Sequence, residues 1–204
     1  MGYTHYWYRP LEIPPDIMKK IAQDIRKLVP VLEQHGVKLA DGLGRGKAEI
    51  TAERIWFNGP GNCGHEQRDL CIAWPAPGAG GVGETKDSVE GSWFAGSTIS
   101  TRCCGGDCSH ETFSLPQKMG KEYLQESSDH PGLYFECCKT AFKPYDIAVT
   151  AALIVAKHYL GDQISVSSDG EEAQWFDGQM LCQTVLDYGM GYTLEKLGAV
   201  AEAA

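Results

Sequence analysis

The sequence predicts an α+β fold, a two-layer sandwich in which one mixed or antiparallel sheet is packed by about three helices. Long segments with helical apolar spacing alternate with short segments rich in β-branched and aromatic residues. The chain has 204 residues, of which 43% are hydrophobic and 22% charged, enough to build one substantial core. We therefore expect a single domain over residues 1–204.

The first half of the chain predicts a strand, a helix and a hairpin. Residues 3–9, "YTHYWYR", have strand composition. Residues 15–34 repeat apolar side chains every three or four positions, which predicts an amphipathic helix that Pro30 kinks or ends early. Residues 48–59, "AEITAERIWFNG", predict a strand or a hairpin.

The second half predicts three more strands and two more helices. Strands are expected in residues 110–116, "HETFSLP", in residues 132–140, "GLYFECCKT", and in residues 163–170, "QISVSSDG". Residues 143–162 and 171–189 predict helices, the first with Pro144 near its start and Gly161 at its end. The apolar run of the first is about half the length that spans a bilayer, so we interpret it as a buried helix.

Residues 60–109 differ in character from the rest of the chain. They hold five of the eight cysteines and the run "PAPGAGGVGE", and they show no sustained helical period. We predict a Gly- and Cys-rich loop inserted into the α+β domain. In a reducing compartment, clustered Cys and His residues indicate a metal site or redox chemistry more often than disulfides.

The two ends of this insert carry related motifs, "NCGHE" at residues 62–66 and "DCSHE" at residues 107–111. Zinc takes four tetrahedral ligands from thiolates and imidazoles, and the glycines in Cys-Gly-Gly-Asp-Cys allow that segment to wrap around an ion. We predict a structural zinc site with these ligands: Cys63, His65, Cys104 and Cys108.

Other ligand sets remain open at this point. A symmetric set replaces Cys104 with His110, and Cys71 or Cys103 are further candidates. Disulfides or buried thiols are the competing interpretation of the same cysteines, and a catalytic metal is a third. Closing a loop of roughly 40 residues costs about 3 kcal/mol beyond a constant, and a structural zinc supplies roughly 10–16 kcal/mol. The energetics therefore favour a metal.

A second candidate site precedes the apolar helix. Lys139, Thr140 and Lys143 lie before its N-terminus, where free N–H groups favour an anion such as phosphate. Tyr145, His110 and Glu111 are included in this candidate ligand-binding set. The alternative is that Thr140 or Asp146 caps the helix while the lysines are solvated.

His5 lies among aromatic residues of the first strand. It either joins His110, Glu111 and Tyr145 in an acid–base set or is a hydrogen-bonded structural residue. No nucleophile elbow or zinc-protease motif occurs in the chain. Whether the protein is an enzyme is left undecided by the sequence.

The charge and the N-terminus limit the classes of partner and location. A formal net charge of −9 makes nucleic acid an unfavoured partner, since phosphate backbones need basic surface. The start "MGYTHYWYRP" shows no secretory signal, and we expect a cytoplasmic protein that binds no membrane. The expected partner is a protein or a small anionic ligand.

Several segments together resemble a family of small uncharacterised proteins of bacteria and their phages. They are "MGYTHYW", "FNG" followed by "HETF", "CKTAFKPYDIAVTAALIVAKHYLGD" and "ISVSSDG". The chain is similar to the longer form, in which a Cys-bearing insert separates "FNG" from "HETF". The resemblance implies a single-domain body with an insert and a phage or mobile-element origin, and it implies no activity.

Three hypotheses for function follow. The first is a non-enzymatic binding or accessory protein with a structural zinc in its insert, whose aromatic residues, Trp74, Trp93 and Phe94, contact a partner. The second is a hydrolase or transferase acting on a phosphate-bearing small molecule. The third is a module associated with nucleic acid.

Overall fold

The computed structural model describes residues 3–63, 102–120 and 125–195, together with the backbone of four short strands between residues 71 and 98. The body contains these elements in order: β1 (Thr4–Arg9), α1 (Pro15–Gln34), β2 (Glu49–Ile50), β3 (Arg54–Phe57), β9 (Phe113–Pro116), β10 (Tyr134–Lys139), α2 (Asp146–Leu160), the 3-10 turn η2 (Gly161–Gln163), β11 (Ser165–Ser168) and α3 (Glu172–Leu186). The insert contributes β4 (Cys71–Ile72), β5 (Val82–Gly83), β6 (Trp93–Phe94), β7 (Ser97–Thr98) and β8 (Arg102–Cys103). The predicted α+β class is confirmed.

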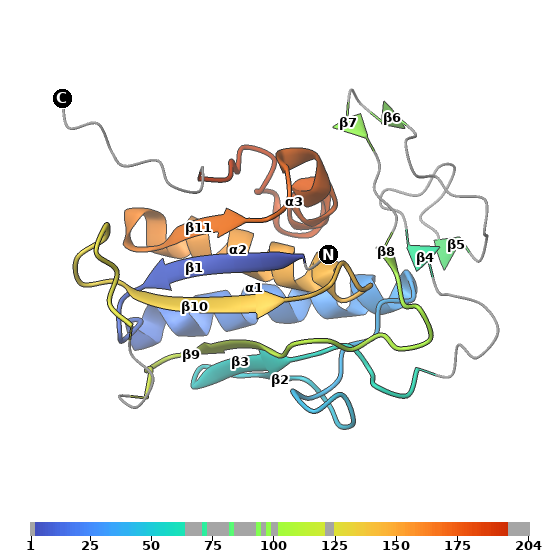
Figure 1. The fold of residues 1–204 in the computed structure, drawn as a ribbon, viewed down its shortest axis with the longest axis horizontal. Helices are drawn as coiled ribbons and strands as arrows, with labels where there is room; N and C mark the ends of the chain where they lie inside the picture. Colours follow the sequence, from blue (N-terminus) through green and yellow to red (C-terminus); the bar gives the residue numbers. More distant parts are fainter. Residues whose placement is uncertain are drawn as a thin grey trace.

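The strands of the body form two antiparallel sheets, where the sequence predicted a single sheet. Their orders are β10-β1-β11 and β2-β3-β9, and Figure 1 shows the two sheets one above the other, with α1 and α2 behind the first sheet. β1 is the central strand of the first sheet, with His5 opposite Cys138 on one side and Ser168 on the other. The first strand of the chain is therefore completed by strands from its last third.

At the end of β10, His110 and Glu111 bind the backbone amide and carbonyl of Lys139, which a further strand would otherwise use. The amide of Lys139 donates to Glu111 Oε2 at 2.7 Å, and its carbonyl accepts from His110 Nδ1 at 2.7 Å and from the Glu111 amide at 3.1 Å. We call these three residues the sheet junction. This substitution of side chains for a strand ladder explains why the sheet is divided.

Helix α1 buries the apolar stripe that the sequence predicted, including Met18, Ile21, Leu28 and Leu32. Of the two effects expected of Pro30, a kink or an early end, the early end is wrong, because the helix continues to Gln34. Pro30 and Arg26 both lie on the solvent side of α1. The Arg26 carbonyl has no helical hydrogen-bond donor, because Pro30 has no N–H group. Water satisfies such an exposed carbonyl, so the missing hydrogen bond does not stop the helix here.

Helix α2 is the centre of the helical layer. Every residue from Asp146 to Ala156 is buried, since α1, α3 and β11 all pack against this helix. The prediction of a buried helix is confirmed. Among the residues described above, no helix has both the length and the apolar character needed to cross a membrane.

Helices α2 and α3 approach each other closely at Gly178. A Cβ atom placed on Gly178 would lie 2.5 Å from Thr150 Oγ1 and 3.1 Å from the Ala151 amide nitrogen. Side chains in packed interiors rarely approach so closely, so glycine at this position sets the separation of the two helices.

Replacing Gly178 with alanine is expected to destabilise the protein by about 1–3 kcal/mol through overpacking, against a gain of about 1 kcal/mol in helix propensity. Urea denaturation measures the difference. Gly191→Ala is the control, because no atom lies within 4 Å of the added methyl group. A Gly178→Ala protein as stable as this control would contradict the close approach of the helices.

Candidate metal centre and buried ion cluster

The two ends of the insert meet at a neck formed by residues 58–63 and residues 102–110. Asn58 binds His110 twice, since its Nδ2 donates to the His110 carbonyl at 2.8 Å and its Oδ1 accepts from the His110 amide at 3.1 Å. A Cβ atom on Gly59 would lie 1.9 Å from the Cys108 carbonyl oxygen, so only glycine allows this approach. The neck is thus closed by contacts of the body itself.

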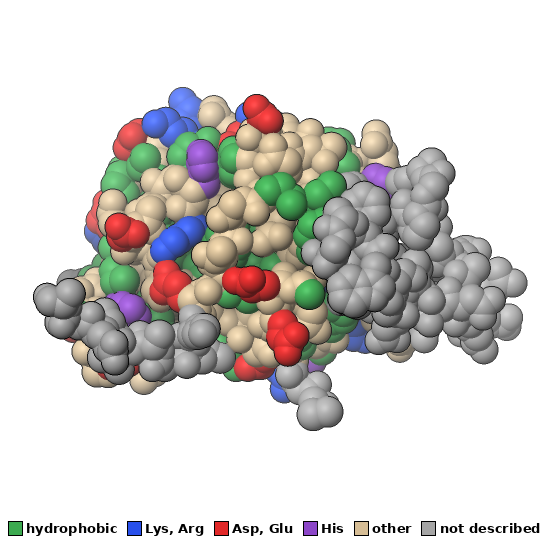
Figure 2. Space-filling view, turned by 90° about the horizontal axis from the view of Figure 1, so that it is seen from above, with side chains coloured by type: hydrophobic (Ala, Val, Ile, Leu, Met, Phe, Trp, Pro, Cys, Tyr) green, Lys and Arg blue, Asp and Glu red, His purple; other side chains and the backbone are tan. Residues whose placement is uncertain are grey.

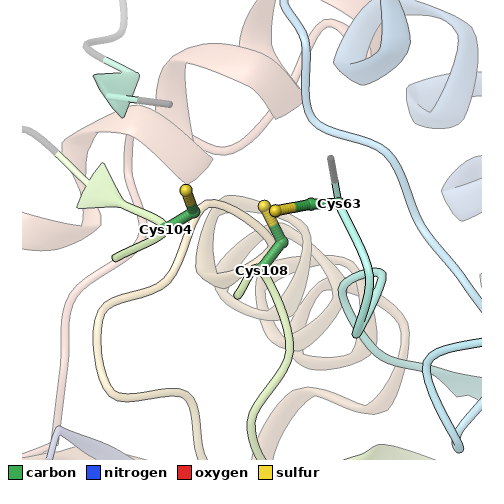
Figure 3. A group of neighbouring side chains, drawn as sticks. All are labelled: Cys63, Cys104 and Cys108. Carbon is green, nitrogen blue, oxygen red and sulfur yellow. The ribbon is translucent and has the colours of Figure 1, made fainter. Parts of the chain in front are cut away.

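Three cysteines meet at this neck. The Sγ atoms of Cys63, Cys104 and Cys108 all lie within 4.8 Å of one another. Figure 3 shows Cys63 approaching from the chain after β3, and Cys104 and Cys108 from the chain after β8. None of the three is in a disulfide, and Cys104 and Cys108 are buried. A Zn–S bond is about 2.3 Å long, which places two sulfurs of a tetrahedral site roughly 3.8 Å apart. The cluster therefore has the size of a metal site.

The segment between Cys104 and Cys108 folds as the glycines predicted. Gly105 and Gly106 have φ of 58° and 83°, values that favour glycine, and the Asp107 amide donates to the Cys104 carbonyl at 3.2 Å. The Cys63 thiol lies 3.6 Å from the Gly106 carbonyl. This tight turn brings Cys104 and Cys108 to one side, as metal-binding loops do.

The electrostatics of the cluster favour a bound cation. Burial raises the pKa of the Cys108 thiol, and the nearby Cys63 and Cys104 raise it further. The Lys143 ammonium group donates to the Cys104 carbonyl, which places one positive charge beside the turn. Thiols held together in this way ionise readily only when a metal replaces their protons.

The remaining candidate metal ligands are His65, Cys71, Cys103 and His110. His65 lies outside the described residues, as does the side chain of Cys71. Cys103 is disulfide-bonded and therefore supplies no thiolate in this structure, and its partner in the strand register is Cys71. The His110 ring is bound to Lys139 at the sheet junction.

The predicted ligand-binding set is only partly brought together. His110, Glu111 and Lys139 meet at the sheet junction through the backbone of Lys139, and the Tyr145 hydroxyl donates to the Glu111 carbonyl at 2.6 Å. Thr140 is buried and does not cap α2, whose first turn has no capping side chain. These contacts are structural, and they leave the predicted anion pocket without its threonine.

A site that the sequence analysis missed surrounds Asp146, the first residue of α2. Its Oδ1 accepts from His5 Nε2 at 2.7 Å and from the Thr140 hydroxyl at 2.5 Å, and its Oδ2 accepts from Arg102 Nε at 2.7 Å. The other ring nitrogen of His5 lies 3.0 Å from the Ser168 hydroxyl. His5 is fully buried, which confirms its interpretation as a hydrogen-bonded structural residue.

Arg102 connects Asp146 to a second buried carboxylate. Its Nη1 donates to Asp177 on α3, and its Nη2 donates to the Gln174 carbonyl at 2.7 Å. Arg102 and Asp146 are 0% exposed and Asp177 is 2% exposed. We call His5, Arg102, Thr140, Asp146 and Asp177 the ion cluster.

The surroundings shift the pKa values of the two carboxyl groups of the ion cluster in opposite directions. Burial alone would raise the pKa of Asp146, but Arg102, His5 and Thr140 outweigh it and lower the pKa from 3.8 to about 2. Burial raises the pKa of Asp177 to about 6, against the opposing effect of Arg102. Asp146 therefore contributes stability that is lost as the pH falls from about 4 to about 2, and the contribution of Asp177 changes only above that window.

Signals for the ion cluster exist in the sequence but are weak. Arg102 is the single charged residue between Glu90 and Asp107. This isolation among uncharged residues is one signal of a special environment. Asp177 follows Trp175 and Phe176 within an apolar helix face. Each of these charges needed a buried partner, and no sequence pattern identifies which residue it is.

The distribution of charged side chains on the surface is consistent with the formal net charge of −9. Figure 2 shows acidic and basic side chains interspersed over one face of the described residues, without a basic patch on that face.

No protein-family model, curated protein or solved structure matches this chain. The arguments for function therefore depend on the two sites alone.

Asp146→Asn is expected to reduce the acid sensitivity of the fold. The parent should lose about 2 kcal/mol more unfolding free energy than the variant as the pH falls from about 4 to about 2, because the variant has no carboxylate to protonate there. Urea unfolding at several pH values measures this loss. Asp16→Asn, which removes an exposed acid, should leave the parent's loss unchanged. An Asp146→Asn protein with the full acid loss would show that another group is responsible.

Proposed function

We propose that the protein is a non-enzymatic binding or accessory protein of the cytoplasm whose insert is fixed to the body by a structural zinc ion. The observation that carries this proposal is the meeting of the Cys63, Cys104 and Cys108 sulfurs within 4.8 Å at the neck of the insert. The bacterial and phage family resemblance, with its mobile-element origin, belongs to the same proposal.

Zinc is the ion that best suits this donor set. Three soft sulfur ligands within 4.8 Å of one another favour zinc over magnesium or calcium, which prefer oxygen ligands. His65 follows Cys63 by two positions and is the proposed fourth ligand. His110 is described in the structure but is not among the residues whose ligand atoms lie within 4.8 Å of one another at the sulfur cluster, which favours His65.

A structural role fits better than a catalytic one. Four protein ligands complete a tetrahedral zinc and leave no position for water or substrate. The residues that an enzyme acting on phosphate would use are bound elsewhere, with Thr140 on Asp146 and Lys143 on the Cys104 carbonyl. Thiolate ligands require reduced cysteines, and Cys63, Cys104 and Cys108 are all outside disulfides.

The zinc would fix the geometry of the neck, and its role would not be limited to closing the loop. The pairing of β3 with β9 and the bonds of Asn58 to His110 already bring the insert ends together. Metal binding would instead fix the orientation in which residues 64–101 leave the body. We propose that this oriented insert carries the contact surface for a protein partner or small anionic ligand.

Metal content tests the proposal on protein purified without an affinity metal. Elemental mass spectrometry should find one zinc per chain in the parent and none in a Cys63→Ser, Cys108→Ser double variant, because two of the thiolate ligands are gone. Loss of zinc from His65→Gln would support the fourth ligand.

Cys137→Ser is the matched control, since Cys137 is an exposed thiol outside the cluster and should leave the zinc content unchanged. A parent protein without zinc, or a double variant that retains all of it, would refute the metal centre.

A further inference from the structure

The guanidinium group of Arg102 is held by contacts from four directions. Its three nitrogens donate to Asp146, Asp177 and the Gln174 carbonyl, and the group lies 4.4 Å from the centre of the Phe142 ring. Two carboxylates, a carbonyl and an aromatic face are the features that recognise a planar, charged guanidinium. A lysine ammonium group satisfies this geometry less well.

Every one of these contacts comes from the body and none from the insert. Asp146 begins α2, Gln174 and Asp177 lie on α3, and Phe142 lies in the turn that connects β10 to α2. Arg102 itself is the first residue of β8, on the chain that returns from the insert. The insert therefore supplies the occupant, and the body supplies the pocket.

The turn beneath the guanidinium has strained backbone that fixes one wall of the pocket. Ala141 and Phe142 both have positive φ, of 50° and 55°, although neither is glycine. The Phe142 amide donates to the Thr140 hydroxyl at 3.3 Å, and the Phe142 ring also packs edge-on against Tyr3 with centroids 4.8 Å apart. Strain of this kind persists only where the surrounding structure holds it, and here it directs an aromatic ring toward the cation.

The pocket requires a cation for electrostatic reasons. Without Arg102 it would contain the carboxyl groups of Asp146 and Asp177, with His5 and Thr140 as the remaining partners of Asp146. Breaking a buried ion pair by removing one partner is strongly destabilising, because a charge is left uncompensated. A guanidinium from another source would relieve that cost.

We propose that this pocket is a guanidinium-binding site of the body and that Arg102 is its tethered ligand, released when the neck opens so that the arginine group of another molecule binds in its place. Cys104 of the metal centre follows Arg102 by two residues, so the metal holds the tether in position. The release step rests on the proposed zinc site, whereas the recognition of guanidinium does not.

The recognition step is tested in the zinc-loaded Arg102→Ala protein. Methylguanidinium should raise its thermal unfolding temperature in a saturable way, because the additive replaces the missing group, and urea of the same shape but no charge should not. Arg102→Ala combined with Asp177→Asn should bind methylguanidinium at least about tenfold more weakly.

Arg54→Ala is the matched control. Arg54 also pairs with a carboxylate and lies over an aromatic ring, but it is exposed, so methylguanidinium should not stabilise this variant. If Arg102→Ala folds poorly, its refolding yield with methylguanidinium against urea gives the same readout. Equal behaviour with the two additives would overturn the proposal.

The release step is tested on the parent protein with its zinc present or removed by a chelator. L-arginine and a short arginine-containing peptide, each carrying a fluorophore, are titrated into both forms. Binding only after zinc removal is expected, with the tighter of the two probes identifying a free amino acid or a peptide as the source. Absence of binding in the chelated parent would overturn the release step, even if the Arg102→Ala protein binds methylguanidinium. A parent protein purified without zinc would instead refute the metal centre.

Discussion

The carboxylate of Asp146 is the group on which the arrangement of the body depends. It accepts hydrogen bonds from β1 through His5, from the turn after β10 through Thr140, and from the returning insert chain through Arg102. An ionised carboxylate in the interior is tolerable only when it is paired and hydrogen-bonded. Its three donors therefore fix the start of α2 relative to β1 and the insert, and α2 in turn is the helix on which α1 and α3 pack.

The chain that returns from the insert is attached to the body at two neighbouring points. Arg102 enters the ion cluster, and Cys104 joins the sulfur cluster beside Lys143. Both Arg102 and Cys104 are fully buried. Two attachments so close in sequence leave little freedom between them, so the state of the sulfurs and the position of the guanidinium are mechanically linked. This linkage gives the insert a role in the stability of the body.

Much of the fold was predictable because it depends on local patterns. The periodicity of residues 15–34 identified α1, and the glycines of residues 104–108 identified the turn that brings two cysteines together. The sulfur cluster was found from the spacing of Cys63 against Cys104 and Cys108. The division into two sheets was not predicted, since it depends on which backbone groups Glu111 occupies at Lys139.

The ion cluster escaped prediction for a different physical reason. Its members come from five separate segments, and each side chain has an ordinary local explanation. Asp146 resembled a helix cap and His5 a lone structural histidine, although α2 has no side-chain cap and the two residues bind each other. Long-range pairing between polar groups has no period in the sequence, and the visible signals are the isolated charge of Arg102 and the place of Asp177 directly after Trp175 and Phe176.

The central position of β1 has a consequence for how the chain folds. Its neighbours are β10 and β11, so His5 must find Cys138 and Ser168 across most of the length of the protein. Contacts of such large sequence separation slow folding, because the intervening chain must be ordered first. During synthesis, the N-terminal strand emerges first, and its two neighbours follow only with residues 134–139 and 165–168. Its three consecutive aromatic residues, Tyr6, Trp7 and Tyr8, lack their native neighbours throughout that interval, which exposes this short strand to aggregation in the nascent protein.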